Sequence, residues 1–129
     1  MQFIAKPRAE QRIGIKLFEF ACVVWNASMV FNMITRIFRV RVPLALHSEF
    51  EQKFLSVSVP FIEAEPGFIS VTVGKPTQWA PEEYVMVSVW HSEADIAAFA
   101  GENWNSAVIP QGMEKYVSEC WVHHYENFN

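Results

Sequence analysis

The sequence predicts an α+β domain with one antiparallel sheet and two helices. Three observations support this prediction. Apolar residues alternate with period two in four segments, they recur at helical spacing in two others, and the order is strand, helix, strand, strand, helix, strand. This order is typical of the ferredoxin-like βαββαβ unit, in which both helices cover the same face of the sheet.

The composition is that of one packed domain. The 129 residues are 51% hydrophobic, 15% aromatic and 19% charged, with a net charge of -4. This balance supports a core and argues against disorder. The sequence has no basic patch, nucleic-acid motif or bilayer-spanning stretch, so neither nucleic acid nor a membrane is an expected partner. We expect a cytoplasmic protein with Cys22 and Cys120 as reduced thiols; a disulfide between them is the alternative.

Residues 1–31 are interpreted as an N-terminal extension and residues 32–129 as the domain. The extension contains an apolar stretch that Lys16 and Glu19 interrupt and that is too short to span a bilayer. Two interpretations stay open. Either the natural start is Met33, or the extension adds a strand or helix that packs on the domain.

The first predicted strand and helix cover residues 33–42 and 47–67. The strand alternates, with Arg36 and Phe38 on one face, and a proline ends it. In the helix, Ser48 and Glu51 fit a capping box, and Pro60 predicts a kink.

The second and third predicted strands, residues 68–74 and 84–90, are joined by a proline-containing loop. In the third strand Met86 and Trp90 share a face, and Val87 lies on the other.

The second predicted helix spans residues 92–100, with Ser92 as its N-cap and Asp95 at the third helical position. Residues 101–117 contain glycines and a proline that interrupt regular structure, so we expect short helical turns there. The last strand covers residues 118–128.

The sheet face away from the helices also carries large apolar side chains. A sheet with two apolar faces needs a second covering layer. Two copies stacked sheet to sheet supply that layer, so the pattern predicts a homodimer.

Two segments, AEPGFISVTV (64–73) and EEYVMVSVWHSEADIAAF (82–99), followed by the aromatic last strand, resemble the antibiotic biosynthesis monooxygenase domain family. The likeness covers about residues 33–128. It implies a dimeric α+β barrel built from two ferredoxin-like units.

The family includes cofactor-free oxygenases that convert aromatic polyketides to quinones, haem-degrading enzymes and signal-molecule isomerases. The quinone-forming members use an Asn and a Trp on the third strand and a Tyr on the next helix. Trp90 matches the Trp, whereas Met86 and Ile96 stand in the other two places. The haem-degrading set of Asn, Trp and His falls on Phe38, Phe99 and Ile109. Neither set is reproduced whole.

Trp90, His123 and His124 are the candidate catalytic residues. The Trp90 indole suits stacking on a flat aromatic ligand, and a histidine suits deprotonation of a phenol. The two histidines are consecutive on a strand and face opposite ways, so only one faces the pocket and they form no metal site together. The alternative for Trp90 is a core residue between sheet and helix, and for each histidine a structural hydrogen bond.

Six further residues are candidate substrate contacts: Arg36, Phe38, Met86, Asn103, Trp104 and Tyr125. Arg36 on the helix face needs a partner, either Glu119 or a ligand carboxylate. Asn103 and Trp104 lie in an irregular stretch, where the alternative is turn formation with Trp104 as an anchor.

The main hypothesis is a cofactor-independent monooxygenase that binds a small aromatic or quinone-type compound between sheet and helices. It needs a dry pocket that stabilises the substrate anion. One alternative is a non-catalytic dimeric module that binds a small ligand or haem. The other is a structural or regulatory protein whose own side chains fill the pocket. No cofactor or metal is expected.

Overall fold

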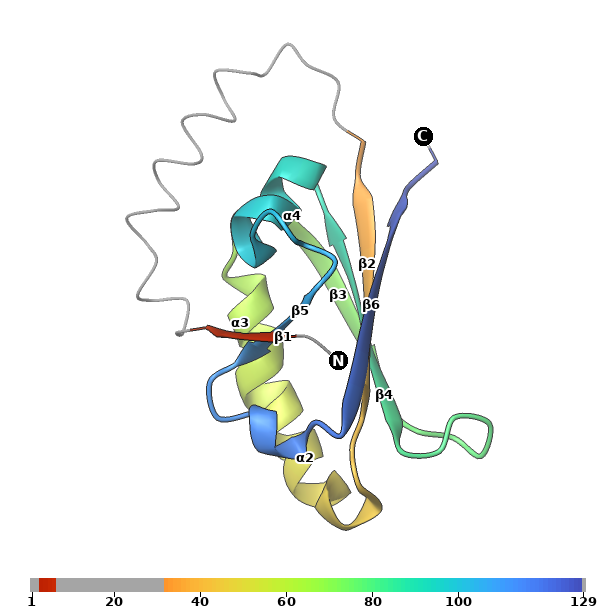
Figure 1. Cartoon of the computed structure of the whole chain (residues 1–129). Helices are drawn as coiled ribbons and strands as arrows, with labels where there is room; N and C mark the ends of the chain where they lie inside the picture. Colours follow the sequence, from red (N-terminus) through yellow and green to blue (C-terminus); the bar gives the residue numbers. More distant parts are fainter. Residues whose placement is uncertain (1–2, 7–31, 129) are drawn as a thin grey trace.

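The computed structural model describes residues 3–6 and 32–128 of the chain. Its main sheet has four antiparallel strands in the order β3-β4-β2-β6, and helices cover one side of it (Figure 1). The strands are β2 (Ile34–Arg41), β3 (Phe68–Gly74), β4 (Glu83–Trp90) and β6 (Glu119–Glu126). This strand order is that of a ferredoxin-like unit, so the predicted fold is confirmed.

The register of the sheet places the candidate side chains in rows. Arg36 on the central strand β2 lies opposite Ser88 on β4 and His124 on β6. Two residues further on, Phe38 lies opposite Met86. Because neighbours across a ladder share a face, both rows face the helices.

The first helical layer is one irregular helix. A 3-10 turn (Leu44–Leu46) leads into α2 (His47–Lys53), a π-helical segment (Phe54–Ser58) follows, and α3 (Val59–Glu63) completes it. The expected break near Pro60 is present, one turn earlier, because proline has no N–H to continue the α-helical ladder. The capping box was wrong, because Ser48 lies inside α2 and makes no cap hydrogen bond.

The second helix, α4 (Glu93–Ala100), begins as expected. The Ser92 hydroxyl accepts a hydrogen bond from the Asp95 backbone N–H at 3.3 Å. Asp95 packs so closely on Gly67 that a side chain at residue 67 would overlap its carboxyl group. Gly67 also has a φ of 84°, in the left-handed region that favours glycine, which explains the turn of the AEPG segment.

The stretch after α4 differs from the expectation of helical turns. It contains the strand β5 (Ala107–Pro110), which pairs in parallel with β1 (Phe3–Lys6), and only then a 3-10 turn (Glu114–Tyr116). All four residues of β5 are buried, and the strand lies on the helix side of the sheet (Figure 1). Residues 7–31, with most of the predicted extension and Cys22, lie outside the described residues.

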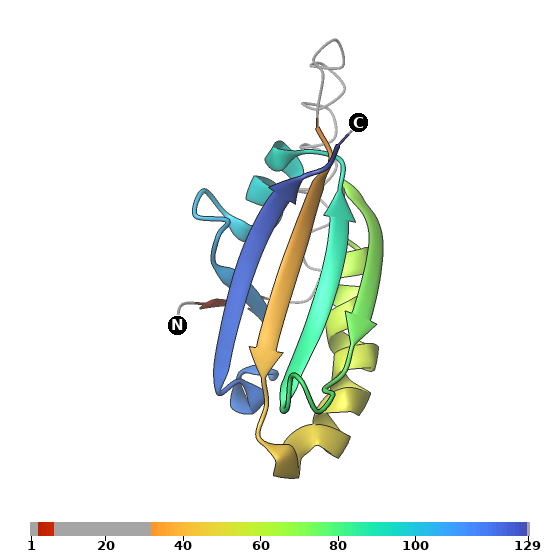
Figure 2. The ribbon, with the colours of Figure 1, turned by 90° about the vertical axis from the view of Figure 1, so that its right-hand side faces the viewer.

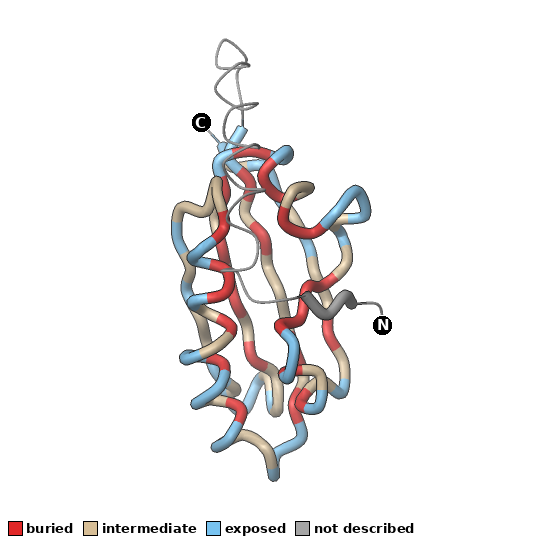
Figure 3. The backbone as a smooth tube through the Cα atoms, turned by 90° about the vertical axis from the view of Figure 1, so that its left-hand side faces the viewer, coloured by how far each residue is buried: buried red, intermediate tan, exposed pale blue. Residues whose placement is uncertain are grey.

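The core lies between the sheet and the helices. Buried positions alternate along the strands and continue on the facing side of the helices (Figure 3). The opposite face of the sheet has no described helix over it (Figure 2). Its apolar side chains, which include Ile37, Val87 and Trp121, are only partly buried.

Candidate functional site

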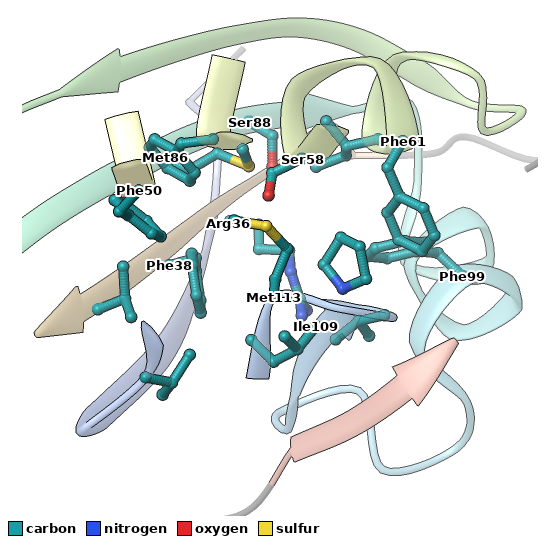
Figure 4. Close-up of a pocket in the computed structure, with 16 residues that line it drawn as sticks. Arg36, Phe38, Phe50, Ser58, Phe61, Met86, Ser88, Phe99, Ile109 and Met113 are labelled. Atoms are coloured by element: carbon teal, nitrogen blue, oxygen red, sulfur yellow. The ribbon is translucent and has the colours of Figure 1, made fainter. Parts of the chain in front are cut away.

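A partly enclosed cavity lies between the helix-facing side of the sheet and the helical layer. The space open to the centres of water molecules is about 40 Å³, enough for about three waters at roughly 10–15 Å³ each. Its walls are mostly apolar and aromatic, with Phe50, Phe61 and Phe99 around the Arg36 side chain (Figure 4). The lining residues are Arg36, Phe38, Val40, Phe50, Phe54, Ser58, Phe61, Ile62, Met86, Ser88, Phe99, Val108, Ile109, Pro110, Met113 and Val117.

Arg36 is the charged side chain in this lining. Only 3% of its surface is exposed. Its Nη1 donates to the Trp104 carbonyl at 2.8 Å and to His124 Nε2 at 2.7 Å, and its Nη2 donates to the Ser106 carbonyl at 3.0 Å. The guanidinium carbon also lies 5.5 Å from the centre of the Phe99 ring. These contacts hold the guanidinium in place without neutralising its charge.

The charge of Arg36 persists despite its burial. Desolvation lowers the pKa of Arg36 below its usual value, to about 10, which leaves the guanidinium protonated at neutral pH. The expected protein partner was wrong. Glu119 pairs with Arg41 on the other sheet face, at 2.8 Å, and no carboxylate in the described part of the chain bonds to Arg36.

His124 is the histidine on the helix side of β6. Its ring makes an edge contact with the Trp104 indole at 4.5 Å between centroids. Burial first, and then the positive charge of Arg36, lower the pKa of His124 from 6.5 to about 4. The imidazole is therefore neutral at pH 7. Because arginine only donates, Nε2 is the accepting nitrogen and the proton resides on Nδ1.

Trp90 lies behind the cavity wall. None of its surface is exposed, and its ring stacks on Phe99 at 5.2 Å and meets the edge of Phe68 at 6.2 Å. The indole N–H donates to Ser88 Oγ at 3.0 Å. Since that oxygen already accepts a hydrogen bond, the Ser88 hydroxyl proton is directed elsewhere, and Ser88 lines the cavity.

Ser58 supplies a second hydroxyl on the helical side. It is the last residue of the π-helical segment, is buried, and makes no hydrogen bond to another described residue. Phe54 and Ser58, four residues apart, lie on the same buried face, and π turns are frequent at functional sites. The sequence signal for Ser58 was a hydroxyl on an apolar helix face shortly before Pro60.

The structure brings only part of the predicted site together. Arg36, Phe38 and Met86 line the cavity. His124 and Trp104 contact Arg36 but not the cavity.

The other three candidates lie away from the cavity. Asn103 is exposed in the turn after α4, and His123 and Tyr125 are exposed on the other sheet face. Sequence reasoning missed Ser58, Ser88 and the residues of β5.

The lining offers few side chains that could ligate a haem iron. Protein ligands to haem iron are typically imidazole, thiolate, phenolate or thioether groups. The residues that line the cavity include no histidine, cysteine or tyrosine, and the thioethers of Met86 and Met113 are the groups of this kind among them. Within residues 3–6 and 32–128, no cluster of three metal-ligating side chains occurs. The lining therefore offers a haem iron no imidazole, thiolate or phenolate ligand.

A helix-capped antiparallel sheet with an apolar cavity between the layers defines the class of protein. The family model for antibiotic biosynthesis monooxygenases matches residues 33–103. The chain belongs to this family. No curated protein matches the sequence.

Solved structures share the fold. A putative antibiotic biosynthesis monooxygenase from Bordetella bronchiseptica is 20% identical, with a TM-score of 0.56 over 76% of this chain and 99% of that one. SnoaB, a cofactor-independent oxygenase from Streptomyces nogalater, is 18% identical, with a TM-score of 0.55 over 76% and 95%. A haem-degrading protein from Mycobacterium tuberculosis is 20% identical, with a TM-score of 0.53 over 75% and 92%. None of the described helices is long and apolar enough to cross a membrane.

The lowered pKa of His124 predicts a pH dependence of stability. The unfolded chain takes up a proton near pH 6.5, whereas the folded protein resists protonation down to about pH 4. The unfolded state therefore binds more protons in this window, and stability falls as the pH drops through it. His124 is half-buried, so solvent screens part of this effect. We expect the free energy of unfolding to fall by about 1 kcal/mol between pH 7 and pH 5.

Urea unfolding of the wild type and of His124→Gln at both pH values measures this loss. Glutamine can still accept a hydrogen bond from Arg36 but does not titrate, so its stability should change less with pH. If the free energy of unfolding changed equally with pH in the wild type and in His124→Gln, a buried, neutral His124 would be contradicted.

Proposed function

We propose that the protein binds a small aromatic compound in the cavity between sheet and helices and oxygenates it without a cofactor. The observation that carries the proposal is the aromatic cavity itself, which five phenylalanine rings and two methionines line around one buried cation. Met86 and Met113 have flexible side chains, which can move apart for a ligand larger than the present space of about 40 Å³.

Membership of the family and the likeness to a cofactor-independent oxygenase support the oxygenase reading. In such a reaction an electron-rich phenol supplies all of the electrons. One atom of O₂ becomes a new carbonyl on the ring, the other leaves as water, and the phenol becomes a quinone. The protein must exclude water and stabilise the substrate anion, which a dry cavity beside a guanidinium favours.

The candidate catalytic roles of Trp90 and His124 become indirect in this proposal. Trp90 would orient Ser88 through its N–H, and His124 would orient Arg36. His123 has no route to the cavity through the contacts of the described residues, so its proposed role as a base needs a ligand on the other sheet face.

A second function, ligand binding without catalysis, is favoured by a specific feature of the lining. Among the described lining residues no carboxylate, imidazole or phenolate is present to accept a proton. A substrate would thus have to enter as its anion, or lose its proton to water. A binding module of the same fold needs no such group.

Oxygen uptake measurements separate the two functions. The purified protein is offered a panel of phenols and hydroquinones in an oxygen electrode, while calorimetry on the same compounds measures binding. Oxygen uptake above the rate of autoxidation, abolished by filling the cavity with Val108→Trp, supports an oxygenase. Binding without oxygen uptake supports the second function. The absence of both binding and oxygen uptake would contradict both functions.

We also propose a homodimer in which two sheets pack through their open faces. The partly buried apolar side chains of that face support it, among them Ile37, Val85, Val87, Val89 and Trp121. Arg39 and Arg41 flank Trp121, each with its guanidinium carbon 5.4 Å from the ring centre, and give the patch a charged border. An apolar centre with a polar rim is typical of protein interfaces.

A further inference from the structure

We propose that the ligand of the cavity carries an anionic oxygen, a carboxylate or a phenolate on an aromatic ring, and that this oxygen binds the guanidinium of Arg36. The inference rests on the proposed function, because it names the class of compound that the same cavity takes.

The buried charge of Arg36 has no negative partner among the described residues, which is unfavourable for the stability of the folded protein. A buried cation is destabilising unless a negative group pairs with it. Arg36 is 3% exposed, and its partners in the described part of the chain are two backbone carbonyls and a neutral imidazole. These groups accept hydrogen bonds but carry no net negative charge. The site is one anion short of neutrality.

Arg36 has more N–H donors than its contacts with the described residues use. A guanidinium has five N–H groups in a planar fork. Three of them are used in the contacts to Trp104, Ser106 and His124, so Nε–H and one Nη2–H have no partner among the described residues. Adjacent N–H groups of this kind bind the two oxygens of a carboxylate, or one phenolate oxygen, with charge-assisted hydrogen bonds.

The other polar groups of the lining can also donate hydrogen bonds. Ser88 Oγ accepts the Trp90 N–H, which leaves its own proton for the cavity. The Ser58 hydroxyl, buried on the opposite wall, has no partner among the described residues. A cation and two hydroxyls converge on an otherwise apolar space (Figure 4). This arrangement is complementary to an apolar molecule with one anionic end.

Matched ligands test the inference directly. Calorimetry at pH 7.5 compares benzoate with benzamide, which has nearly the same shape but no charge. A parallel titration with 4-nitrophenol follows its visible absorption, which reports the phenolate and thus separates the phenolate source from the carboxylate source. We expect the wild type to prefer an anionic probe by about tenfold or more, the ratio that corresponds to one pKa unit.

Two arginine variants locate the effect. Arg36→Gln keeps amide donors but removes the charge, and the preference should disappear. Arg39→Gln is the matched control, because Arg39 lies on the same strand and faces the opposite side of the sheet. It should keep the preference. If Arg36→Gln does not fold, the NMR signal of the Arg36 Nε–H in the wild type should shift with benzoate and not with benzamide.

These experiments distinguish a failure of this inference from a failure of the proposed function. Equal affinity for benzoate and benzamide, without a phenolate preference, would overturn this inference and leave the proposed function standing. An anion preference that survives in Arg36→Gln would overturn it as well. Absence of binding by any probe and by the wider phenol panel would overturn the proposed function, and the inference with it.

Discussion

Replacing Trp90 by alanine is expected to lower the free energy of unfolding by about 3–5 kcal/mol, the usual cost of removing a buried aromatic ring. The indole is fully buried, stacks on Phe99 and packs against Phe68, so the substitution leaves a void that the rigid sheet cannot close. Urea unfolding followed by far-ultraviolet circular dichroism measures the change.

Trp90→Phe separates the packing of this residue from its hydrogen bond. It keeps most of the ring but removes the N–H that donates to Ser88 Oγ. We expect the free energy of unfolding to fall by about 1–2 kcal/mol, close to the combined effect of losing one buried hydrogen bond and creating a small void. If Trp90 orients Ser88 for the ligand, this variant should also bind aromatic anions more weakly while it remains folded. Unchanged binding would restrict Trp90 to the core.

Replacing Val87 by glutamate is expected to convert the protein from a dimer to a monomer. Val87 lies on a central strand, in the middle of the open sheet face, where a second sheet would bury its side chain. An unpaired carboxylate in such an interface costs several kcal/mol, and about 1.4 kcal/mol corresponds to a tenfold change in the dissociation constant. Light scattering at micromolar concentration measures the mass of both proteins.

Leu55→Glu is the control for this substitution. Leu55 is an exposed apolar residue on the helical side, 59% accessible, and it is distant from the proposed interface. It should leave the association state unchanged. A wild type that scatters as a monomer would contradict the proposed homodimer, and a monomeric Leu55→Glu would place the contact on the helices instead.

Strand faces were predictable because they depend only on alternation. The side of the sheet on which Arg36, Met86 and Trp90 lie follows from period two within a single segment, and the structure agrees. The N-cap at Ser92 was predictable for a similar reason, since a cap is a contact between residues three apart. The β5 strand was not, because its partner β1 is distant in sequence and no local period signals the pairing.

The membership of the site depended on contacts that no local pattern encodes. Whether the Trp90 indole faces a cavity or the core depends on where Phe99 and Phe68 come to lie. The partner of Arg36 could not be chosen either, since Glu119 is on the same neighbouring strand as His124 but on the opposite face. That Ser58 lines the cavity depends on how the helix packs over the sheet, since its position on the helix alone does not place it beside Arg36 and Ser88.

The sequence by itself determined the order of the four main strands and the two helical segments between them, the faces of the strands and the excess of apolar surface on the open side. These properties follow from backbone periodicity and from the burial of apolar side chains, which act over a few residues at a time. Only the tertiary structure decided that Arg36, Ser58 and Ser88 converge on one cavity while Trp90 stays behind it. That outcome depends on strand register and on the packing of helices against the sheet, which bring together residues that are far apart along the chain.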